Sequence, residues 1–210
     1  MGMCLPVIEE RLRIAKRNLP AVEEYLDRRG KLVQATIMKE SIARPVVQHF
    51  RHTDRHRQDW FCMLRVDEER IEHSAVLYWL HCPRGRRGSE TLEAIQVRPQ
   101  GRSLYFDTHF FGRWGLRTEQ LRVKLTNMQG FFSRYPRLTM LDVETFKHGR
   151  RAMAAAIDHG LVHGAVLGRW LISCDTFIGL QHMHARDREL WERLRLCRTD
   201  QEGPSGEEQV

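Results

Sequence analysis

A histidine and two arginines recur at helical spacing within the segment THFFGRWGLR, residues 108–117. If this segment is helical, His109, Arg113 and Arg117 stand at i, i+4 and i+8, within about 80° of one helix face. An imidazole moves protons near neutral pH, and guanidinium groups hold phosphate oxygens and developing negative charge. The spacing therefore predicts a metal-independent RNA-cleaving site, with His109 as acid or base and the arginines as a phosphate clamp.

The same segment has a second interpretation, in which it is a tight corner that buries aromatic side chains. Gly112 and Gly115 each disfavour a helix interior by about 1 kcal/mol. The strand expected from Ser103 would then run on to Phe111, with the phenylalanines in the core and the arginines solvated. The two interpretations differ in whether the three polar side chains project together into solvent.

A second group of titratable residues lies in the stretch HFRHTDRHRQD. On a helix, His49, His52, His56 and Asp59 would align and offer ligands to zinc or a similar metal. Pro45 upstream and the β-rich WFCMLRV downstream favour a strand and a polar loop instead. We therefore predict no metal and no other cofactor, and keep a metal at this cluster as the alternative.

Further arginines mark a glycine-flanked loop and a turn close to it. Arg84, Arg86 and Arg87 lie in PRGRRGSE, and Arg102 follows a Pro-Gln-Gly turn. Such arginines grip a nucleic-acid backbone without reading its sequence, whereas the alternative is a solvated hairpin loop. The sequence contains no GxxxxGK[ST], GxGxxG or HExxH motif, which removes the best-known nucleotide and zinc-protease signatures.

The charge of the chain is unevenly distributed. The formal net charge is +7, and the last thirteen residues carry −3, so the first 197 residues carry +10. A body this basic attracts polyanions, which predicts a nucleic-acid partner. The alternative, from a different functional class, is a non-catalytic interaction module that docks on a protein, such as an adaptor, an inhibitor or an immunity-type protein.

The cysteines and the apolar runs indicate the compartment. The five cysteines form no pair spaced for a zinc ribbon or a redox site, and this usage fits a reducing cytoplasm. No apolar run approaches the length needed to cross a bilayer, so we expect no membrane contact.

The order of helices and strands expected from the sequence predicts an α+β fold. Residues 6–43 show helical patterns, with Pro20 starting a new helix and Gly30 ending one. Residues 45–50 fit an edge strand. Four β-rich runs follow with short links, which predicts an antiparallel meander, at residues 60–66, 73–82, 91–97 and 103–108.

Helices return in the second half of the sequence. A helix is expected over residues 119–135 with Thr118 as its N-cap, and another over 144–160. A closing hairpin and an amphipathic helix ending at residue 197 complete the pattern. We therefore predict one domain over residues 1–197, followed by an acidic, disordered tail over 198–210.

Overall fold

A computed structural model of the chain describes residues 4–42, 44–81, 91–118, 123–147 and 149–199. They form, in chain order, α1 (Leu5–Glu40), β1 (Val46–Thr53), β2 (Asp59–Val66), β3 (Ile71–His81), β4 (Thr91–Gln96), β5 (Ser103–Phe106), α2 (Phe110–Arg117), α3 (Lys124–Arg134), β6 (Leu141–Lys147), β7 (Arg150–Ile157), β8 (Gly160–Gly168), β9 (Leu171–Gly179), a 3₁₀ turn (Leu180–His182) and α4 (Ala185–Thr199). None of the described helices has the length and apolar character that a bilayer crossing requires.

The strands make one nine-stranded sheet in the order β1-β2-β3-β4-β5-β9-β8-β7-β6. Every neighbouring pair is antiparallel except β5 and β9, which run parallel. Two meanders therefore meet at the centre of the sheet, and the predicted α+β class is confirmed. The predicted first meander and its edge strand are also confirmed, the edge strand as β1.

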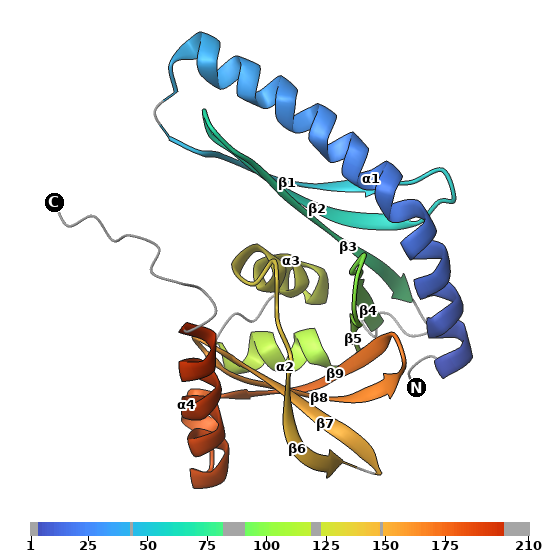
Figure 1. The fold of residues 1–210 in the computed structure, drawn as a ribbon, viewed down its shortest axis with the longest axis vertical. Helices are drawn as coiled ribbons and strands as arrows, with labels where there is room; N and C mark the ends of the chain where they lie inside the picture. Colours follow the sequence, from blue (N-terminus) through green and yellow to red (C-terminus); the bar gives the residue numbers. More distant parts are fainter. Residues whose placement is uncertain (1–3, 43, 82–90, 119–122, 148, 200–210) are drawn as a thin grey trace, which may run out of the picture.

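The sheet curves around two helices, as Figure 1 shows with α2 and α3 enclosed between β1–β3 and β6–β9. The inner face, toward α2 and α3, carries a cluster of aromatic rings that includes Phe106, Phe110 and Phe131, each fully buried. The outer face is covered by α1 over the first meander and by α4 over β7 and β8. The sheet is therefore buried on both faces, with separate hydrophobic clusters on each side.

The N-terminal region is one helix, so the predicted breaks at Pro20 and Gly30 are wrong. Leu19 and Val22, on either side of Pro20, are at most 5 % exposed against the sheet, and packing of this face outweighs the lost hydrogen bond. At Gly30 a Cβ atom would lie 2.4 Å from Cγ2 of Ile71. Glycine stands there because the helix passes close to β3, and it does not end the helix.

The helix predicted over residues 144–160 is also wrong, because this segment forms β6 and β7. Met153, Ala155 and Ile157 face the inner core, while the alternate alanines face α4. A strand buried on both faces can be alanine-rich, since small side chains let a helix approach closely, and this overrides the helix propensity of alanine. The closing hairpin is confirmed as β8 and β9, which continue this second meander.

Candidate functional site

The segment that carries the predicted His109, Arg113 and Arg117 is helical. His109 immediately precedes α2, and its backbone N–H donates to Oδ1 of Asp107 at 2.9 Å. Thr118 closes the same helix, donating its N–H to the Trp114 carbonyl, so its predicted role as N-cap of the next helix is wrong.

The aromatic residues of this segment form part of the inner core. Phe110, Phe111 and Trp114 are at most 1 % exposed. The segment is therefore a helix that buries its aromatic residues, and the alternative in which the strand from Ser103 runs on to Phe111 is wrong, because β5 ends at Phe106. Its polar residues lie on the remaining surface of α2.

Arg113 stabilises an irregularity in β9. The register between β8 and β9 passes from His163↔Thr176 to Gly164↔Cys174, which leaves Asp175 as an extra residue in a β-bulge. Nη1 of Arg113 donates to the Asp175 carbonyl at 3.0 Å and to Oγ1 of Thr176 at 2.7 Å. Part of the guanidinium is thus committed to the protein's own backbone.

Arg117 lies beside Arg113 and is half-buried. Burial, and then the positive charge of Arg113, lower the pKa of Arg117. Its Nη1 is buried without a hydrogen-bond partner among the described residues. The structure brings the two arginines together, but it ties one to a bulge and covers part of the other.

A carboxyl group lies next to His109 at the end of the parallel strand pair. Burial raises the pKa of Asp107, and the neighbouring Asp175 raises it further, although backbone N–H groups and His109 act in the opposite direction. His109 itself is exposed. The arrangement offers an accessible imidazole beside a carboxyl group, which is chemistry suited to proton transfer.

The histidine cluster considered as an alternative metal site is divided by the pleat of β1. His52 stacks on Tyr25 of α1, with ring centroids 4.3 Å apart, whereas His49 lies on the opposite face, against Phe61. Asp59 is paired with Arg51 at 2.7 Å. The described residues contain no group of three histidine, cysteine or acidic side chains placed to hold a metal.

The predicted loop arginines have different outcomes. Arg84, Arg86 and Arg87 lie outside the described residues. Arg102 is described, and its Nε donates to the Arg169 carbonyl in the turn between β8 and β9 at 3.3 Å.

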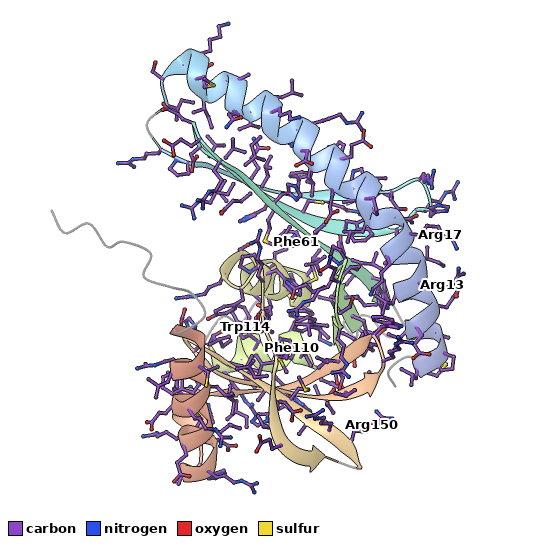
Figure 2. All side chains as sticks on the ribbon, viewed as in Figure 1. Arg13, Arg17, Phe61, Phe110, Trp114 and Arg150 are labelled. Carbon is purple, nitrogen blue, oxygen red and sulfur yellow. The ribbon has the colours of Figure 1, made fainter. Side chains whose placement is uncertain are left out.

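That turn carries an exposed tryptophan surrounded by cations. Trp170 is 49 % exposed, with Nζ of Lys16 5.0 Å and Cζ of Arg169 4.8 Å from its ring centroid. We call Lys16, Arg102, Arg169 and Trp170 the Trp170 surface. Figure 2 shows two more arginines of the same helix, Arg13 and Arg17, on the outward side of α1.

Of this surface the sequence singles out Arg102 alone, because Lys16, Arg169 and Trp170 come from distant parts of the chain. The signals available were the cations of the first helix and a tryptophan in a predicted turn, and neither is informative alone. Packing of α1 across the sheet brings Lys16 to the β8–β9 turn. No protein family, curated protein or solved structure matches this chain, so its functional interpretation depends on its own geometry and charge.

Proposed function

We propose that the protein binds single-stranded nucleic acid through the Trp170 surface. The observation that carries this proposal is a tryptophan 49 % exposed, with two cations within 5.0 Å of its ring centroid. An exposed indole stacks on a base of any type, contributing about 1–3 kcal/mol per base. Cations around it bind the phosphates on either side of that base.

The local charge supports an anionic ligand. Lys16, Arg102 and Arg169 meet at Trp170, and Arg17 lies one residue beyond Lys16 on α1. Of the carboxylates nearby, Glu10 is paired with Arg13 at 2.6 Å, and Glu9 lies beside the β8–β9 turn, with its Oε1 3.0 Å from where a Cβ atom of Gly168 would be. One carboxylate thus stands against the four cations. The surface therefore keeps an excess of positive charge, in agreement with the basic character of the whole chain.

Binding is favoured over cleavage as the function, because the two arginines predicted to hold the phosphate are not both available to a ligand. Arg113 donates to Asp175 and Thr176, and Arg117 is partly covered. RNA cleavage by His109 stays a prediction. The proposed compartment is the reducing cytoplasm, since the described cysteines are free thiols.

The test is titration of a fluorescein-labelled oligothymidylate, and of the matching RNA, at low salt. We expect Trp170→Ala to weaken binding about tenfold, because one stacking contact is lost. The pair Lys16→Gln and Arg169→Gln should weaken it further.

The matched control is Arg186→Gln with Arg193→Gln, two exposed arginines of α4. This pair removes the same net charge and leaves the Trp170 surface intact. Absence of binding at low salt, or full affinity in Trp170→Ala, would contradict the proposed function.

A further inference from the structure

A groove opens on the inner side of the first meander, far along the sheet from Trp170. It has a volume of about 660 Å³. One wall is the inner face of β1–β3, and the other is the end of α3 with the segment that follows it. Its lining includes Val47, Met63, Arg65, Arg134, Arg137 and Leu138.

The strand at the mouth of this groove is an open sheet edge. β1 is the last strand on its side, and all eight of its residue pairs with β2 are in unbroken register. The opposite edge strand, β6, has a register shift between Asp142 and Phe146 and a positive φ of 55° at Glu144. Bulges protect an edge from pairing with another chain, so β6 is protected and β1 is left available.

The groove is apolar at its mouth and cationic along its walls. Val47 is 57 % exposed although it is a large apolar residue on a strand. Arg65 and Arg137 are exposed arginines of the two walls. Among the described lining residues the only carboxylate is Glu72, and it accepts a hydrogen bond from Arg70 at 3.1 Å.

We propose that the free edge of β1 and this groove bind an extended, acidic segment of a partner protein. The segment adds as a strand beside β1, and main-chain hydrogen bonds supply affinity while its groove-facing side chains supply selectivity. Acidic side chains reach Arg65 and Arg137, and apolar ones cover Val47 and Met63. A second copy of the chain fits less well, because the segments on either side of β1 carry Arg44, Arg55 and Arg57 in both copies.

The probe is a fluorescein-labelled synthetic peptide of repeating Glu-Thr-Val-Thr, which presents glutamate and valine alternately on one face of a strand. Titrated against the full chain, it should bind at least tenfold more tightly than the Lys-Thr-Val-Thr peptide. N-methylation of every second residue of the glutamate peptide should also weaken its binding at least tenfold, because it removes backbone hydrogen-bond donors. Bound peptide should slow amide hydrogen exchange in Val46–Thr53 and leave Leu141–Lys147 unchanged.

Protein variants separate this site from the nucleic-acid surface. Arg65→Glu with Arg137→Glu should weaken peptide binding at least tenfold, and the α4 variant Arg186→Glu should not. The same groove variants should leave oligonucleotide binding by the Trp170 surface unchanged, so either proposal can fail alone.

Three results would overturn the proposal for the groove. The first is equal binding of the glutamate and lysine peptides, or no binding of either. The second is unchanged hydrogen exchange in β1 with peptide bound. The third is self-association in sedimentation that Val47→Glu abolishes, because the occupant of the edge would then be a second copy.

Discussion

Asp54 connects the β1–β2 turn to α1 and to the core. Its Oδ2 accepts from Nε1 of Trp60 at 3.0 Å and from Nδ2 of Asn18 at 2.9 Å. Both donors belong to residues at most 2 % exposed. We expect Asp54→Ala to lower the free energy of unfolding by about 2 kcal/mol, because buried donors lose their acceptor. Urea denaturation measures this, and a loss within error of zero would contradict it.

The same carboxylate makes stability depend on pH. Burial alone would raise the pKa of Asp54, but hydrogen bonds from Gln58, Trp60, His56 and Asn18 outweigh it and lower the pKa. A depressed pKa in the folded state stabilises the protein above the unfolded value of about 3.9. That stability is lost as the pH falls through the folded pKa. The melting temperature of Asp54→Asn should therefore fall less steeply below about pH 4 than that of the wild type.

RNA cleavage by His109 has a direct test. Because His109 is exposed, His109→Ala should leave the fold unchanged. If the imidazole moves a proton during cleavage, this variant loses activity on labelled RNA about a hundredfold or more, in EDTA as in its absence. His56→Ala, another exposed histidine in the β1–β2 turn, is the control. Wild-type protein that leaves RNA intact would reject the enzymatic prediction and would not affect the binding proposal.

Two glycines inside helices should respond to alanine in opposite directions. At Gly112 in α2, a Cβ atom would have Cε of Lys124 as its nearest neighbour, at 3.8 Å. Gly112→Ala should therefore stabilise the protein by up to about 1 kcal/mol through helix propensity. At Gly30 in α1, the Cβ would lie 2.4 Å from Cγ2 of Ile71.

Gly30→Ala should consequently destabilise the protein by about 1–3 kcal/mol, as overpacked contacts do. Thermal unfolding of the two variants beside the wild type checks both signs. A stabilising Gly30→Ala would show that α1 can move away from β3 at little cost.

The elements that the sequence predicts well are those whose patterns are local. The strands β2–β5 are short runs rich in apolar and aromatic residues and are separated by turn residues, so their positions are predictable within a few residues. The alanine-rich β7 is not, because its environment comes from α4 on one face and the aromatic cluster on the other. Pro20 and Gly30 mislead in the same way, since tertiary packing holds α1 together across both.

The candidate sites also divide into features that local sequence predicts and features that depend on tertiary contacts. Local spacing correctly suggests that Arg113 and Arg117 share a helix, which His109 immediately precedes. It gives no sign of the bulge at Asp175 that binds Arg113, because a bulge is a property of two paired strands. The Trp170 surface and the groove both depend on contacts between distant segments, so a local pattern marks single members such as Arg102 but not the assembled surface.

Over the molecule as a whole, the sheet curves around its largest aromatic cluster, and cations lie both on the outside of the curve and along the walls of the groove. The aromatic cluster lies inside the curve around α2 and α3, with the centroids of neighbouring rings such as Phe106 and Phe110 4.9 Å apart. Cations such as Arg13, Arg17 and Arg150 lie on the outside (Figure 2). A basic protein of this shape can attract a polyanion in two ways, through its summed field or through one local surface.

Salt dependence distinguishes the two. Each phosphate contact to single-stranded nucleic acid contributes about −0.7 to the slope of log K against log salt. If the three cations of the Trp170 surface each bind a phosphate, the slope is about −2. Lys16→Gln with Arg169→Gln should then make the slope less steep by about 1.4.

The α4 pair Arg186→Gln with Arg193→Gln lowers the net charge by the same amount. If binding is local, this pair leaves the slope unchanged, because the Trp170 surface retains all of its phosphate contacts. An equal change in both pairs would show instead that the field of the whole chain attracts the ligand. Nucleic-acid binding would then be nonspecific, and Trp170 would have no particular part in it.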